Sequence, residues 1–191
     1  MEIVDCVQTS LRAVGKDEHW IRDWIVRKPS RLGLGDLEIR RHEIVRREHH
    51  GGRIDILAYR REVNTFYEIE IMMDDSDADH GIRTLAFWSR ERLKNPDANH
   101  VAVLVSEALS VKYQSLLEGL PQVLPFIGID IKVLMLASKK RLVAILPSII
   151  VQSRDVTIEI GDSANRAAKS LPFTGAESAE KNCPKNPYLM L

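Results

Sequence analysis

The chain has 191 residues, of which 45% are hydrophobic and 28% are charged, as in an ordinary soluble globular protein. Its formal net charge is zero, so overall charge does not favour general nucleic-acid binding, although Arg and Lys are in excess between Arg22 and Arg61. The two cysteines lie far apart and form no metal-binding spacing, which favours a reducing compartment. We see no signal-peptide pattern and no apolar run long enough to span a bilayer, so we expect a cytoplasmic protein without a membrane partner.

The first half of the chain predicts one helix followed by strands. Apolar and aromatic residues recur at helical spacing over residues 17–28, after an acidic start and before a proline, which is typical of a helix. Residues 37–48 alternate loosely and predict one or two strands. Residues 53–60 and 65–73 are two apolar, alternating runs separated by a short turn, and we expect them to form a hairpin.

The second half predicts alternating helices and strands. We expect a long helix over residues 77–94, an internal strand over 100–107 covered on both faces, and a short helix that ends at Gly119 and Pro121. Late strands are expected over 129–138 and 141–151. The order predicts an α/β fold (an α+β mixed sheet flanked by helices) over residues 1–155, and the polar composition predicts a mostly disordered tail over 156–191.

The run "YEIEIM" places two glutamates within an apolar strand. Side chains alternate between the faces of a strand, so Glu68 and Glu70 share one face and the more consistently apolar residues share the other. If the hairpin pairs regularly, Asp55 approaches one of these glutamates. Carboxylates held together repel one another, and a divalent cation would relieve the repulsion; oxygen ligands favour Mg²⁺ or Mn²⁺. The alternative is a solvent-facing strand whose glutamates pair with arginines such as Arg53 or Arg83.

The segments "EHWIRDWIVRKP", "GGRIDILAY" and "FYEIEIM", followed by a long helix, resemble the PD-(D/E)XK nuclease superfamily, which has the restriction-endonuclease-like fold. The resemblance covers about residues 16–136 and implies a Mg²⁺-dependent enzyme that hydrolyses DNA. It implies metal ligands at Asp55 and Glu70, with Glu18 (or Asp17) as the acid of the first helix and Glu68 as a further ligand. It is closest to a bacterial branch with a "DxxH" motif, which implies a phosphate or water contact for His80.

Two positions depart from the pattern of the superfamily. The motif lysine, two residues after Glu70, is replaced by Met72, which cannot activate a water molecule. A Gln and a Tyr of one branch are replaced by Arg83 and Phe87. Arg83 could supply the missing positive charge from the neighbouring helix, or it could simply neutralise a glutamate.

Three functional hypotheses follow. The first is a metal-dependent nuclease in which Asp55, Glu70, Glu68, His80 and Arg83 carry the chemistry. Its phosphate contacts would come from arginines of the basic region, namely Arg40, Arg46, Arg53 and Arg60. The second hypothesis is an inactive nuclease-fold module that binds nucleic acid or a protein, as Met72 suggests. The third is a structural or regulatory subunit that forms a homodimer.

Overall fold

The computed structural model describes residues 5–42, 54–73, 79–107, 109, 114–138, 141–154 and 156, with only the backbone of residues 79, 80 and 116. These residues all belong to one compact unit, residues 1–161. The expected tail from residue 156 onward lies outside the described residues, apart from Val156. No helix within the described ranges is long and apolar enough to cross a membrane.

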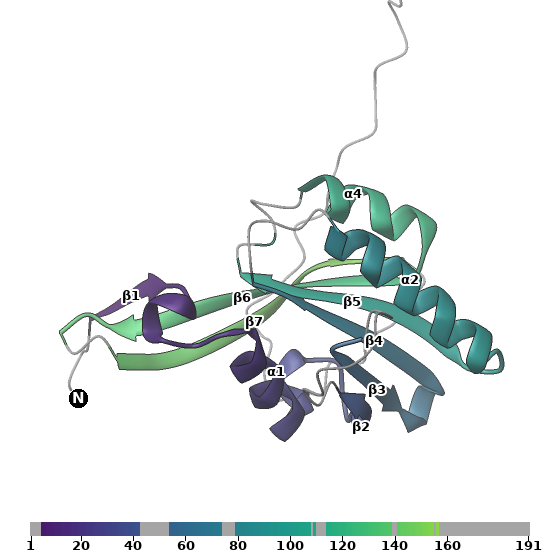
Figure 1. The fold of residues 1–191 in the computed structure, drawn as a ribbon, viewed down its shortest axis with the longest axis horizontal. Helices are drawn as coiled ribbons and strands as arrows, with labels where there is room; N and C mark the ends of the chain where they lie inside the picture. The colour runs from purple at the N-terminus through teal and green to yellow at the C-terminus, as the bar shows by residue number, and fades with distance from the viewer. Residues whose placement is uncertain are drawn as a thin grey trace, which may run out of the picture. The chain divides into compact units, whose positions relative to one another are not determined.

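The described strands form one mixed sheet with the order β1-β6-β5-β4-β3-β2, and β7 also pairs with β6 (Figure 1). The meander β2-β3-β4 is antiparallel, β4-β5-β6 is parallel, and both β1 and β7 run antiparallel to β6. The strands are β1 (Cys6–Thr9), β2 (Glu38–His42), β3 (Ile56–Arg60), β4 (Thr65–Met72), β5 (Asn99–Glu107), β6 (Phe126–Leu136) and β7 (Arg141–Gln152). The α/β mixed sheet expected from the sequence is therefore confirmed.

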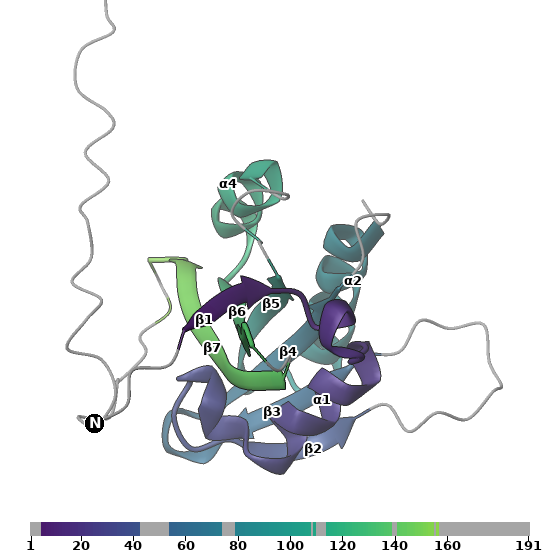
Figure 2. The ribbon, with the colours of Figure 1, turned by 90° about the vertical axis from the view of Figure 1, so that its left-hand side faces the viewer.

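Helices lie on both faces of the sheet. Figures 1 and 2 show α2 and α4 over one face and α1 over the other. The α-helices are α1 (Glu18–Arg27), α2 (Asp79–Lys94) and α4 (Gln114–Val123), and the short 3-10 helices are η1 (Arg12–Val14), η2 (Pro29–Leu32) and η3 (Arg61–Val63). Asp17 caps α1, because its Oδ1 accepts a hydrogen bond of 2.8 Å from the amide of Trp20.

The two faces have separate hydrophobic clusters. On the α1 face, Ile21 and Ile25 pack with Tyr67, Ile69 and Ile71 of β4 and with apolar residues of β5 and β6. On the other face, the cluster joins apolar residues of β4, β5, β6 and α4 with two from the connecting segments, Leu109 and Leu124. The residues from the four elements are Met72, Ala102, Leu104, Leu117, Leu120 and Phe126. A central strand that is covered on both sides reads as a continuous apolar run, as β5 does.

One expectation about the elements needs correction, and one strand was not predicted. The third α-helix does not end at Gly119 and Pro121 but continues to Val123, and Leu124 N donates to Leu120 O at 3.1 Å across the proline. A proline removes its own amide donor and crowds the carbonyl of residue i−4, but Pro121 lies in the last turn of α4 and the bond from Leu124 continues the helix past it. Strand β1 was not predicted, because four residues carry too little pattern; it is held by pairing with β6.

Candidate functional site

Both glutamates of β4 are buried. Glu68 and Glu70 are each 1% exposed, and Met72 on the same face is fully buried. The interpretation of the glutamate face of β4 as solvent-facing is therefore wrong. Helix α2 packs against β4 and β5 and covers this face. Buried carboxylates need compensation by hydrogen bonds, by positive charge or by bound cations.

Asp55 lies next to Glu70 at the end of the hairpin. The register pairs Ile56 with Ile69, so its extension by one residue sets Asp55 opposite Glu70. Asp55 is 2% exposed, and its Oδ2 accepts a hydrogen bond of 2.8 Å from the amide of Ile71. Burial raises the pKa of Asp55 to about 7, the charge of Glu70 adds to the rise, and the Ile71 amide opposes it. The hairpin therefore brings together the two carboxylates that the resemblance implies.

Arg83 of α2 contacts this acid pair. Its Nη2 lies 2.8 Å from Oε1 of Glu70, and the side chain of Arg83 is 40% exposed whereas that of Glu70 is 1% exposed. The charge of Arg83 also lowers the pKa of Asp55, although less than burial and Glu70 raise it. Arg83 thus contacts the buried acid through Nη2, and its side chain remains partly exposed.

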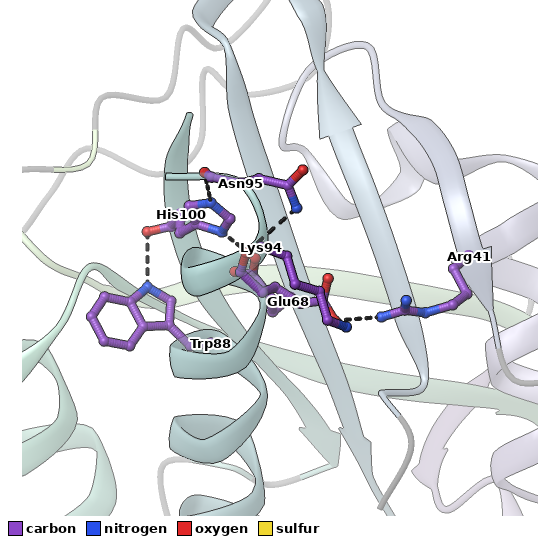
Figure 3. Close-up of polar contacts among 7 residues, drawn as sticks. Arg41, Glu68, Trp88, Lys94, Asn95 and His100 are labelled. Atoms are coloured by element: carbon purple, nitrogen blue, oxygen red, sulfur yellow. Dashed lines mark hydrogen bonds and ion pairs between the residues drawn. The ribbon is translucent and has the colours of Figure 1, made fainter. Parts of the chain in front are cut away.

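Glu68 belongs to a different cluster, shown in Figure 3. Its Oε1 lies 2.7 Å from Nδ1 of His100, and Nε2 of His100 lies 2.9 Å from the carbonyl oxygen of Asn95. A carbonyl oxygen only accepts, so Nε2 must carry a proton. Burial raises the pKa of Glu68 to about 7, although the hydrogen bond from His100 opposes this. For His100, burial acts to lower the pKa, but the bonds to Glu68 and Asn95 outweigh it and the pKa is raised.

Glu91 completes this second cluster from α2. It is 3% exposed, and its Oε1 lies 2.6 Å from Nη2 of Arg41 and 2.8 Å from Nζ of Lys94. Burial acts to raise the pKa of Glu91, but the bonds from Lys94 and Arg41 outweigh it, so the pKa is lowered. The sequence analysis missed both Glu91 and His100; only the spacing of Glu91 and Lys94 carried a signal.

The other predicted site residues are taken one by one, as far as the structure describes them. Glu18 begins α1, and its charge contributes to the raised pKa of Asp55. Nη2 of Arg40 lies 2.8 Å from Oε2 of Glu38, and the side chain of Arg40 is 43% exposed. Arg60 was expected to contact a phosphate. Its side chain is only 7% exposed, so it does not offer such a contact. Arg46, Arg53 and the side chain of His80 lie outside the described residues.

The acid pair has the donor chemistry for a hard cation. Mg²⁺ is commonly bound by one or two carboxylates, with water and substrate phosphates filling the remaining positions, and Asp55 and Glu70 supply two carboxylates. Within the described ranges, no group of three or more His, Cys, Asp or Glu residues is placed to hold a metal ion. The pair thus offers two oxygen ligands, and the described residues complete no larger ligand group.

Comparison with protein-family models, with curated proteins and with solved structures found no match.

Proposed function

We propose that the protein is a nuclease-like, Mg²⁺- or Mn²⁺-dependent hydrolase of phosphodiester bonds, acting on DNA in the cytoplasm. The observation that carries the proposal is the burial of Asp55 against Glu70, which raises the pKa of Asp55 to about 7. Like charges buried together are costly, and perturbed carboxylates cluster at functional sites. The resemblance to the PD-(D/E)XK superfamily supports the same assignment, because its motif falls on these two residues.

The residues of this chain would divide the work. Asp55 and Glu70 would hold the metal ion. Glu18 at the start of α1, whose charge acts on Asp55, is the further acid that the resemblance implies. A bound metal ion of this kind lowers the pKa of a water molecule and stabilises developing negative charge. Arg83 would hold a phosphate oxygen, because a guanidinium has five donors in a planar fork and only part of this set faces Glu70.

A second candidate function is an inactive nuclease-fold module that binds nucleic acid or a protein. Met72 favours it. The side chain of Met72 is fully buried, and it packs with apolar residues of β5, β6 and α4. No polar group therefore reaches the acid pair from this position of β4. In this case Arg83 would only neutralise Glu70.

Cleavage assays with matched variants separate the two candidates. The purified chain is incubated with plasmid DNA and with single-stranded oligonucleotides, with Mg²⁺, with Mn²⁺ and with EDTA. Asp55→Asn and Glu70→Gln should abolish cleavage, whereas Asp23→Asn should not, because Asp23 is an acid of α1 whose side chain is 53% exposed.

A thermal shift with each metal gives an independent readout. A cation that binds only the folded protein raises the melting temperature, and Asp55→Asn should remove this rise. Wild-type protein that binds DNA in a salt-dependent manner but never cleaves it would favour the inactive module. Cleavage that survives both acid substitutions would reject the assigned site.

A further inference from the structure

Helix α2 presents positive charge on its exposed surface. Residues 81–94 include four basic side chains and one acidic side chain, Glu91, and Glu91 is 3% exposed. This part of α2 therefore shows solvent its cations and almost nothing of its acid, although the formal net charge of the whole chain is zero. Positive charge concentrated on one surface attracts an anionic partner.

Three of these cations lie in one row along α2. Arg90 and Lys94 follow Arg83 by seven and eleven residues, and at about 100° per residue both point within about 20° of the direction of Arg83. They lie about 10 Å and about 16 Å from it along the helix axis. Phe87, which is within the row, packs with Leu57 of β3. The row therefore runs along the side of α2 that is next to β3.

Glu91 anchors two cations at the far end of this row. Its Oε1 lies 2.6 Å from Nη2 of Arg41 and 2.8 Å from Nζ of Lys94, and Figure 3 shows Arg41 reaching from β2 toward Lys94. The side chains of Arg41 and Lys94 are 49% and 51% exposed, whereas that of Glu91 is 4% exposed. One carboxylate cannot neutralise two cations, so this end of the row keeps a net positive charge.

Buried groups also orient the other two cations. Nη2 of Arg83 lies 2.8 Å from Oε1 of Glu70, and the side chain of Arg83 is 40% exposed. The guanidinium carbon of Arg90 lies 5.7 Å from the ring centroid of Phe87, within the range of a cation–π contact, and Arg90 is exposed. A side chain that is already oriented loses less conformational entropy when a ligand binds.

The length of the row selects a polymer over a single anion. A phosphate group accepts hydrogen bonds of about 3 Å, so one phosphate cannot bridge cations that are spread over about 16 Å. One strand of B-form DNA carries a phosphate every 3.4 Å or so along its axis, and the row would span about five nucleotides. Arg83 contacts the acid pair, so such a strand would lead directly to the proposed site.

We propose that Arg83, Arg90 and Lys94, together with Arg41, bind the sugar–phosphate backbone of the nucleic-acid strand that enters the acid pair. The inference rests on the proposed function, because that function supplies the strand. Backbone contacts carry no sequence information, so this basic row would hold strands of any sequence.

The first test measures binding of short, fluorescently labelled DNA duplexes by the whole wild-type chain, in EDTA so that no cleavage occurs. The logarithm of the binding constant should fall with the logarithm of the salt concentration with a slope of about −3 to −4, because four contacted phosphates contribute about −0.9 each. Duplexes of unrelated sequence should give the same slope. A slope shallower than about −2, or no binding, would overturn the inference.

The double variant Arg90→Gln/Lys94→Gln removes two charges from the row. We expect it to bind the duplex about tenfold more weakly at low salt and to make the slope shallower by about 2. The matched control is Arg27→Gln/Lys28→Gln, which removes the same two residue types from an exposed position at the end of α1, on the other face of the sheet (Figure 1). The control should keep the wild-type slope, and an equal change in both variants would overturn the inference.

Arg41→Gln gives a second measurement from a different element, which decides the point if the double variant melts before the wild type. Its slope should be shallower by about 1, since one phosphate contact is lost. An unchanged slope in Arg41→Gln would remove Arg41 from the row and reject the inference as stated.

An acidic polymer without phosphate tests the class of the ligand. Polyglutamate at the same concentration of charge should not displace the duplex. Displacement by polyglutamate that depends on Arg90 and Lys94 would assign the row to an acidic protein and overturn the inference.

The binding test and the cleavage test fail separately. Cleavage that needs Asp55, together with a salt slope that Arg90→Gln/Lys94→Gln leaves unchanged, would leave the nuclease assignment standing and reject the row. Salt-dependent binding that needs the row, without cleavage by any metal, would reject the enzyme and keep the row as a nucleic-acid-binding surface.

Discussion

Glu68 Oε1 and His100 Nδ1 lie 2.7 Å apart, and both side chains are 1% exposed. Since Nε2 of His100 already donates to a carbonyl oxygen, the contact at Nδ1 holds one proton between an imidazole and a carboxylate. Arg41 and Lys94 form ion pairs with the neighbouring Glu91. Glu68 is thus compensated by His100, whereas Glu70 contacts Arg83.

This shared proton predicts a loss of stability at alkaline pH. The pKa of His100 is raised above its ordinary value of 6.5, so the folded state keeps a proton that the unfolded chain has lost above this pH. The stabilisation is therefore fully present below pH 6.5 and falls as the pH rises through the folded pKa. We expect the free energy of unfolding to fall by about 1 kcal/mol per pH unit for one proton.

Urea unfolding at a series of pH values from about 6 to 9 would measure this slope. The variant Glu68→Gln is the informative comparison, since an amide oxygen accepts from the histidine without a charge and the slope should become flatter. A slope that is identical in wild type and variant would show that the proton lies elsewhere.

Asp55→Asn should stabilise the protein at about pH 8. The pKa of Asp55 is raised from 3.8 to about 7, so its protonated form is favoured by folding, and stability is lost as the pH rises from the lower to the higher value. Asparagine removes the charge beside Glu70 and can still accept from Ile71 N. We expect the free energy of unfolding at pH 8 to rise by about 1–3 kcal/mol. Each kcal/mol corresponds to a rise of roughly 2–4 °C in Tm.

The gain should be smaller at about pH 5, where the folded wild type already carries the proton. Differential scanning calorimetry of both proteins at the two pH values would check this. If Asp55→Asn is less stable than wild type at pH 8, then the negative charge of Asp55 does not destabilise the folded protein, and the prediction is wrong.

The sequence was sufficient to predict the hairpin and the closeness of Asp55 to one of the two glutamates, Glu68 or Glu70. Alternation fixes which residues share a face, and a short turn favours the antiparallel pairing. The register of the structure, which pairs Ile56 with Ile69, selects Glu70. The sequence was not sufficient to predict the contact of Glu68 with His100. His100 is far from Glu68 in the chain, and only the parallel pairing of β4 with β5 brings the two together.

The sequence also predicted the burial of only one face of β4. Tyr67, Ile69 and Ile71 indicated one core face, but the covering of the glutamate face depends on where α2 packs, which no local pattern gives. For Arg83 the two interpretations stayed open in the sequence. The contact of Arg83 with Glu70 places it at the acid pair.

The pair of Glu70 and Arg83 should show strong coupling in a double-mutant cycle. Arg83→Ala leaves Glu70 buried without its guanidinium partner, and we expect a loss of about 1–3 kcal/mol. The double variant Glu70→Gln/Arg83→Ala should recover most of this loss, because the buried charge is gone. Urea unfolding of the wild type, both single variants and the double variant gives the coupling energy. Simple additivity of the two substitutions would mean that the contact carries no net energy.

Met72 should behave as a core residue. Met72→Leu keeps the volume and the apolar character, so we expect a change of less than about 1.5 kcal/mol in stability and unchanged cleavage. Met72→Lys restores the residue type that the superfamily has at this position, but it puts an ammonium group into an apolar cluster. We expect it to lower stability by several kcal/mol or to lower the pKa of the new lysine strongly. Tm and cleavage measured on both variants decide the point: a Met72→Lys protein that is as stable as wild type and cleaves faster would show that the side chain at this position reaches the acid pair.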